Sequence, residues 1–325
     1  MKWIPGLLIV ISFLSACSNE LVVVDKWKDI PVVWGLLNKS DTAHYIRVEK
    51  AFLDPTTSAY DIALIPDSLY YPHAIVTLKR INSGQVFTLE RVDGDLEGYP
   101  RDSGVFAQSP NFLFKIKANV INLVVNEKYE FSLDKGDGTV PVTGNTIILP
   151  KPVLRNPAVG NLLGFRPKSQ FTFMWNQIDN AGIYDLKLRF HYLEKSPSTG
   201  NVYLPKSVEW TVENSIIENE FKIDGGDFYS ALKSNIKEDF EATRRFDSVD
   251  IIVWCGGKEL EEFVKITHAN TGFTSTQDIP TYTNLTEGLG IFSSRNVSYN
   301  TGFQLTPQAL DTLRKGIQTK PLRFQ

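Results

Sequence analysis

Cysteine is nearly absent from this sequence, since Cys17 and Cys255 are the only two among 325 residues. With Cys17 acylated, as expected below, no internal disulfide can form, and zinc sites built on cysteine lack ligands. Cys255 directly follows the apolar run SVDIIVW. We therefore expect a buried, unreactive thiol at this position rather than a nucleophile.

Histidine is also scarce. Its four copies never form the spacings HxH or HxxxH that metal sites use, and they are His44, His73, His191 and His268. The sequence also lacks a Gly-x-Ser-x-Gly elbow, a phosphate-binding loop and a dinucleotide fingerprint. Paired glycosidase carboxylates would have to meet in the fold, which a sequence does not show. These absences favour a protein that is not an enzyme, with no cofactor, no metal and no catalytic residues.

Long apolar runs and a strong charge excess are missing as well. No segment reaches the roughly 20 apolar residues of a transmembrane helix. The formal net charge of −3 gives no indication of a nucleic-acid partner. With 42% hydrophobic and 12% aromatic residues, the chain can bury real cores, and its length favours two domains.

The N-terminus carries one charge, Lys2, then the apolar run IPGLLIVISFL and the sequence Leu-Ser-Ala-Cys. This is the pattern of a secretory signal, and Leu14–Cys17 resembles the bacterial lipobox. The resemblance implies cleavage before Cys17 and acylation of its thiol, which would attach the protein to membrane lipid. We expect a lipid-anchored outer-membrane protein, with the periplasmic or cell-surface face left open.

Short alternating segments separated by Gly, Pro, Asn and Asp predict antiparallel strands. In 183–193, for example, Tyr184 and Leu186 share one face while Asp185 and Lys187 share the other. The expected fold is mainly β, with two antiparallel sandwich domains that are similar to immunoglobulin and fibronectin type III domains. The expected organisation is a signal peptide (1–16), a tether (17–28), an N-terminal sandwich (29–149), a linker (150–161), a C-terminal sandwich (162–300) with an inserted helix (227–240), and a tail (301–325) with a short helix.

Helical spacing is clearest in 228–240, where Phe228, Leu232, Ile236 and Phe240 form one apolar stripe. Asp227 is the expected N-cap of this helix. A second helix is expected at 307–315, with proline in its first turn. The segment 260–267 is expected to be a strand that continues a hairpin after CGGKE.

The most distinctive stretch is TNLTEGLGIFSS, residues 283–294. Asn284 followed by Gly288-Leu289-Gly290-Ile291-Phe292 resembles the closing motif of a family of uncharacterised Bacteroidota outer-membrane lipoproteins. The segment PVVWGLLNKSDTAHYIRVEKAFL, and Trp175 with the later IYDLKLRFHYLE, are similar to the sandwich domains of the same family. The resemblance implies a location and a fold but no activity, and it suggests a TonB-dependent outer-membrane receptor as partner. From the residues we expect Leu289, Ile291 and Phe292 to enter the second core, with a ligand-contacting loop as the alternative.

Two acidic turns, 92–98 and 133–139, offer oxygen ligands from Asp93, Asp95 and Glu97 and from Asp134 and Asp137. Calcium uses similar spacings, but neither turn is a full EF-hand loop, and Asp-Gly is also a common hairpin signal.

Exposed aromatic rings could stack on sugars, and Trp27, Trp34 and Trp210 are the candidates, although each also fits a strand core. The expected function is that of a non-catalytic accessory or binding subunit at the outer membrane. The alternatives are a carbohydrate-binding surface lipoprotein and, after it, an enzyme.

Overall fold

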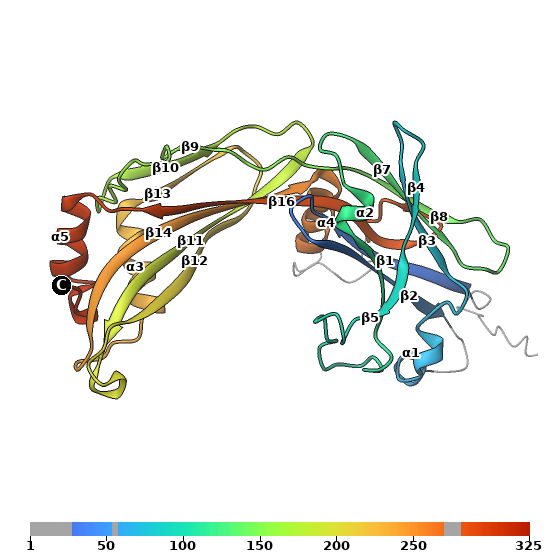
Figure 1. The fold of residues 1–325 in the computed structure, drawn as a ribbon, viewed down its shortest axis with the longest axis horizontal. Helices are drawn as coiled ribbons and strands as arrows, with labels where there is room; N and C mark the ends of the chain where they lie inside the picture. The colour runs from blue at the N-terminus through green and yellow to red at the C-terminus, as the bar shows by residue number, and fades with distance from the viewer. Residues whose placement is uncertain (1–27, 54–57, 270–280) are drawn as a thin grey trace, which may run out of the picture.

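The computed structural model describes residues 28–53, 58–269 and 281–325. Within these ranges the protein is mainly β, with several antiparallel sheets, so the expected fold class is confirmed at that level. Figure 1 shows two layered halves joined by the long strand β16 (Leu289–Phe303). The expected signal peptide and Cys17 lie outside the described residues.

One sheet extends through both halves. It has eight strands in the order β12-β11-β14-β16-β1-β2-β6-β5. Its other strands are β1 (Lys28–Leu37), β2 (Ala43–Leu53), β5 (Glu90–Asp93), β6 (Phe112–Lys117), β11 (Ala181–Lys195), β12 (Leu204–Ile216) and β14 (Thr243–Gly257). β16 pairs in parallel with β1 through residues 289–294 and antiparallel with β14 through residues 295–303. A single strand therefore belongs to both halves.

A second layer completes each half. The N-terminal half has a five-stranded sheet in the order β15-β8-β7-β3-β4, and the C-terminal half has a three-stranded sheet in the order β13-β10-β9. Their bounds are β3 (Ile75–Arg80), β4 (Val86–Thr88), β7 (Lys128–Asp134), β8 (Val142–Ile147), β9 (Leu154–Asn156), β10 (Gln170–Trp175), β13 (Glu220–Asp224) and β15 (Leu285–Thr286).

Helices are few and short in the described chain. They are α1 (Ala59–Ala63), α2 (Ala118–Ile121), α3 (Gly225–Asn235), α4 (Lys258–Ala269) and α5 (Pro307–Lys315), with 3-10 turns η1 (Pro66–Ser68), η2 (Pro197–Thr199) and η3 (Lys320–Leu322). α5 has the predicted bounds, because Pro307 fixes its first turn and the Thr306 hydroxyl accepts a hydrogen bond from the Ala309 N–H at 3.2 Å.

Each half has its own hydrophobic core. The N-terminal core includes Val33, Phe131 and Phe292. The C-terminal core includes Trp175 and Tyr184, whose ring centroids lie 5.3 Å apart. The alternation predicted for 183–193 is confirmed, since the even-numbered residues of this segment of β11 are buried and the odd-numbered charged residues point away from the core. Because the apolar side chains of β11 recur at every second residue, one face of the strand packs against the C-terminal core.

The closing motif contacts the first core and not the second, which corrects the expectation. Phe292 packs with its ring centroid 5.5 Å from that of Phe131 on β7. The reason is the parallel pairing of β1 with the first half of β16, which places Ile291 beside Trp34 and Phe292 beside Gly35.

Two expected connecting segments are parts of the fold. The segment 150–161 contains β9, and its Leu154 enters the C-terminal core. The tail after residue 300 continues β16 to Phe303 and then buries Leu313, Leu322 and Phe324 in the same core. Neither is a free linker or a loose tail, because their apolar side chains fill the C-terminal core.

Two helix expectations also need correction. α3 begins earlier and ends earlier than predicted: Asp224 is its N-cap, Asp227 occupies the third position of a capping box, and the helix stops at Asn235. Phe240 is 75% exposed and lies outside the stripe. The segment 260–267 is helical and belongs to α4, whose Leu260 packs over Gly256 at the junction of the halves.

Candidate functional site

Three adjoining cavities line the face of the eight-stranded sheet that turns away from the cores. Their volumes are about 290, 310 and 430 Å³, close to the size at which small-molecule sites begin. The first and second share Leu36 and Arg295, and the second and third share Trp34. We call the three cavities together the Trp34 groove.

Trp34 lies at the centre of this groove. It alternates along β1 with the buried Val33, so its ring points away from the N-terminal core and is 42% exposed. The ring meets Phe263 of α4 edge to face, with centroids 5.4 Å apart. α4 therefore fixes one edge of the Trp34 ring and leaves the rest open to the groove.

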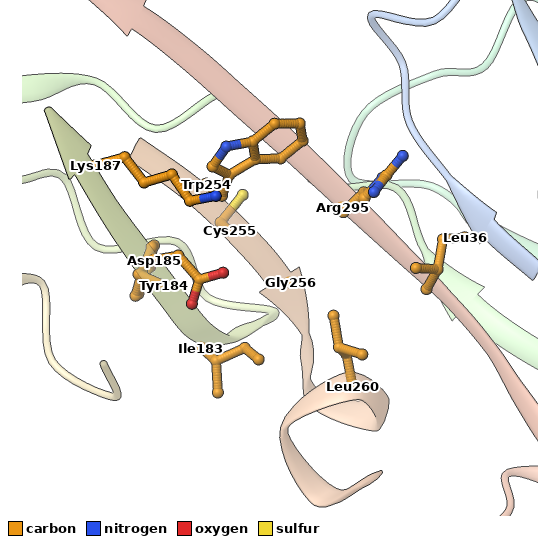
Figure 2. Close-up of a pocket in the computed structure, with 10 residues that line it drawn as sticks. All are labelled: Leu36, Ile183, Tyr184, Asp185, Lys187, Trp254, Cys255, Gly256, Leu260 and Arg295. Atoms are coloured by element: carbon orange, nitrogen blue, oxygen red, sulfur yellow. The ribbon is translucent and has the colours of Figure 1, made fainter. Parts of the chain in front are cut away.

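The first cavity lies between β11, β14, β16 and α4 (Figure 2). Asp185 and Lys187 enter it from β11, and Trp254 enters from β14. Asp185 accepts a hydrogen bond from the Ser215 N–H at 2.9 Å, which holds its carboxylate at the cavity edge. Among the described residues, Lys187 forms no ion pair.

Arg295 connects the first cavity to the second. Its guanidinium lies 5.4 Å from the centre of the Trp254 ring, a cation–π contact. Its Nε atom is buried and has no hydrogen-bond partner among the described residues. The nearby Asp41 has a raised pKa, because burial outweighs the positive charge of Arg295 and the hydrogen bond from Asn38.

The second cavity is lined by Tyr45, Arg47 and Tyr99 in addition to Trp34 and Arg295. The ring centroids of Tyr45 and Tyr99 lie 4.7 Å apart. Arg47 donates to Glu49 at 3.1 Å and to Asn111 at 2.9 Å. These contacts hold the two tyrosine rings against each other and fix the guanidinium of Arg47.

The third cavity is the most apolar end of the groove. Tyr60, Val105 and Phe106 face Trp34 there, and all three are exposed. Glu49 supplies its charge, whereas the ammonium group of Lys50 turns to the other face of β2, over the Tyr71 ring and 3.9 Å from Oδ2 of Asp29. Glu49 is held by Arg101 as well as by Arg47, so its position is fixed from two sides.

Of the three tryptophans proposed from the sequence, the structure places Trp34 in the groove. Trp210 is partly buried against the C-terminal core, which matches the structural alternative. Trp27 lies outside the described residues. Sequence reasoning missed Trp254, Tyr99 and Arg295, because they come from distant segments. The one sequence signal for the face that carries the groove was the alternation of outward charged residues in β11.

The histidines are not brought together. His44 is buried, its Nδ1 has no hydrogen-bond partner, and burial followed by the positive charge of Lys39 lowers its pKa to about 4. Nε2 of His191 lies 2.8 Å from Oδ2 of Asp250. His73 is exposed beside a turn, and His268 lies in α4, where its side chain is outside the described part.

The acidic turns use their carboxylates internally. Asp93 and Asp134 accept hydrogen bonds from backbone N–H groups two residues later, and Glu97 pairs with Lys115 and Tyr45. The hydroxyl and the N–H of Thr139 lower the pKa of Asp137 to about 2. In the described ranges, no group of three or more His, Cys, Asp or Glu side chains is arranged to hold a metal ion.

Cys255 is buried, as predicted from its apolar run. Burial raises the pKa of its thiol to about 12, although a backbone hydrogen bond at Asn296 acts in the opposite direction. A protonated thiol is a poor nucleophile. Cys255 borders the first cavity but is no candidate for chemistry there.

No helix in the described part of the chain combines the length and the apolar character needed to cross a membrane. No family model and no curated protein matches the sequence. Similar solved structures include the three N-terminal domains of the highly immunogenic outer capsid protein of bacteriophage RB49, at 8% identity and a TM-score of 0.28, over 86% of this chain and 71% of that one.

Another is the C-terminal globular domain of an oligosaccharyltransferase from Pyrococcus abyssi, at 9% identity and a TM-score of 0.20. The match covers 86% of this chain and half, 50%, of that one. Both TM-scores are too low to bear on the fold or the function of this protein.

Proposed function

We propose that this protein is a lipid-anchored, non-catalytic binding protein at the outer membrane, acting as the accessory subunit of a receptor or surface assembly. The observation that supports a binding role is the Trp34 groove. Exposed rings and charged side chains line it, while the one thiol at its border is buried and protonated. This composition suits recognition of a ligand without covalent chemistry.

The lipobox-like sequence Leu14–Cys17 supports the anchor. Acyl chains on Cys17 would hold the protein at the membrane surface with no need for a spanning segment. The resemblance of the closing motif to that of Bacteroidota lipoproteins supports a TonB-dependent receptor as the partner. We also infer that each half, although the two share β16, is similar to immunoglobulin and fibronectin type III domains, with the Trp175–Tyr184 contact as the support in the second.

The test is a pull-down of the tagged full-length protein from its native membranes in a mild detergent, followed by mass spectrometry. A receptor barrel that co-elutes in stoichiometric amount supports the accessory role. Cys17→Ala is the control for the anchor and should move the protein out of the membrane fraction. A wild-type protein that elutes alone would contradict the accessory role.

The same pull-down with Trp34→Ala separates two uses of the groove. If the barrel still co-elutes, the groove is free to bind a ligand within the complex. If this variant alone loses the barrel, while its thermal unfolding matches that of the wild type, the groove is the receptor interface.

A further inference from the structure

We propose that the Trp34 groove binds a neutral oligosaccharide, with one sugar unit against each of its three cavities. The proposal rests on the binding role proposed above and names the ligand class. It comes from the composition of the cavities, from the exposure of their rings and from the place of the groove on the sheet.

Each cavity contains an aromatic ring and a carboxylate, and the first two also contain a cation. The sets are Trp254, Lys187 and Asp185 in the first cavity, Tyr99, Arg47 and Asp41 in the second, and Tyr60 and Glu49 in the third. A sugar hydroxyl both donates and accepts hydrogen bonds, so it is matched by a donor and an acceptor placed together. An anionic ligand would meet a carboxylate in every cavity, and the balanced charges therefore favour a neutral one.

The rings provide the apolar part of the recognition. Trp34, Tyr60, Tyr99 and Phe106 are all exposed. One face of a pyranose ring presents C–H groups, which carry slight positive charge and pack well on the negative face of an aromatic ring. Exposed rings in adjoining cavities fit a ligand that repeats such faces along its length.

The unused donors in the groove point to the same class of ligand. Nε of Arg295 is buried without a partner among the described residues, at the boundary of the first and second cavities. A buried donor without a partner is unfavourable, and a hydroxyl or ring oxygen from a ligand would satisfy it. Lys187, which has no ion pair in the described chain, offers a second donor in the first cavity.

An extended peptide fits this groove less well. Peptides commonly bind by adding a strand to a sheet edge. Under the groove, β1 is paired on both sides, with β16 and with β2. The groove therefore offers side chains and no free strand edge, so a ligand must be recognised through its own ring faces and hydroxyls.

The test uses chain 17–325 carrying Cys17→Ala, which keeps every described residue. It is applied to an array of neutral and uronic-acid oligosaccharides of one to six units, and the best neutral series is then titrated by calorimetry. We expect binding to neutral members, with affinity that rises up to three units and then levels off. Trp34→Ala should weaken binding at least tenfold, and Lys187→Met should weaken the trisaccharide more than the monosaccharide.

Phe240→Ala is the matched control, because Phe240 is an exposed ring that lines none of the three cavities and should not affect binding. Thermal unfolding of each variant shows that it is folded. Preference for uronic acids, no binding to the array, or unchanged binding by a folded Trp34→Ala would each overturn the proposal. If no oligosaccharide binds but the receptor co-elutes, the sugar proposal is refuted and the accessory role stands. If an oligosaccharide binds but no receptor co-elutes, the accessory role is refuted and the sugar proposal stands.

Discussion

The side chain of Asn284 holds both backbone polar groups of Phe292. Its Nδ2 donates to the Phe292 carbonyl at 2.7 Å, and its Oδ1 accepts from the Phe292 N–H at 2.9 Å. These are the bonds that a neighbouring strand would make to β16. The spacing between the asparagine and the Gly-Leu-Gly-Ile-Phe sequence thus has a physical reason, since the asparagine covers the edge of β16 that β1 leaves unpaired.

Asn284→Ala should lower the free energy of unfolding by about 1–3 kcal/mol, because it leaves two backbone groups without partners. Asn284→Asp should cost at least as much, since a carboxylate cannot donate to the Phe292 carbonyl. Urea unfolding followed by tryptophan fluorescence measures both. Asn235→Ala, in an exposed asparagine of α3, should stay within about 0.5 kcal/mol of the wild type; equal losses at both sites would contradict this role.

Gly290 is required by close contact between β16 and β1. Its φ is +101°, and a Cβ atom there would lie 2.0 Å from the carbonyl oxygen of Val33. Gly290→Ala should therefore cost about 3–5 kcal/mol, the sum of backbone strain and steric overlap. The measurement is the denaturant midpoint of the purified variant.

Gly302→Ala is the matched control for the strain alone. Gly302 has a φ of +80° in the same strand, and nothing lies within 4 Å of its Cβ position. We expect it to cost about 1–2 kcal/mol. If both variants lost the same amount, steric overlap at Val33 would not be the cause at Gly290.

Local sequence patterns were sufficient to predict the elements that have a clear periodicity or a clear cap. The alternation in 183–193 and the proline at the start of 307–315 predicted β11 and α5, because both signals act within a few residues. Which of the two cores the closing motif enters was not predictable from local patterns. Phe292 enters the N-terminal core only because β16 pairs with β1 from the other end of the chain, and no local pattern encodes that pairing.

The segment 260–267 shows a second limit. Its apolar residues fit a short strand as well as a helix, and the choice depends on Leu260 packing over Gly256 and on Phe263 meeting Trp34. Tertiary contacts thus decide the local structure. The groove was predictable only through Trp34 for the same reason, because its other rings and charges come from separate strands and loops.

Arg244 forms a buried ion pair with Glu194 and anchors the C-terminal segment. Only 2% of the Arg244 surface and 7% of the Glu194 surface are exposed. Its Nε donates to Glu194 at 2.7 Å, and another guanidinium nitrogen donates to the Leu322 carbonyl at 2.7 Å. Burial acts to raise the pKa of Glu194, but Lys206 and Arg244 outweigh it and hold the pKa below its usual value.

Arg244→Met should destabilise the protein by about 3–5 kcal/mol, because the buried Glu194 carboxylate keeps only Lys206 as a partner and the carbonyls of Leu322 and Lys237 lose their donor. Urea unfolding provides the measurement. Arg189→Met removes an exposed pair with Glu209, in which Nε donates at 2.9 Å. That control should cost less than about 1 kcal/mol, and a similar small loss for Arg244→Met would show that the buried pair is not an anchor.

His44 should make the stability of the N-terminal half depend on pH. Only 2% of its surface is exposed, and its Nδ1 has no partner, so the folded state favours the neutral imidazole and the pKa falls from 6.5 to about 4. Between these two pKa values, the imidazole of His44 binds a proton in the unfolded chain and stays neutral in the folded chain. Above about pH 6.5 the full contribution of His44 to the free energy of unfolding should be present. This contribution should fall as the pH drops from 6.5 to about 4 and change no further below that. The total loss through His44 should be up to about 3 kcal/mol.

The measurement is the urea midpoint of the wild type and of His44→Phe at intervals from pH 7.5 to 4. Loss of stability through carboxylate protonation is shared by both proteins and cancels in the difference between them. The remaining difference belongs to the imidazole and should change in favour of the phenylalanine variant as the pH falls, with most of the change between pH 6.5 and 4. Parallel profiles would mean that His44 accepts a proton in the folded protein, and that its buried Nδ1 finds a partner there.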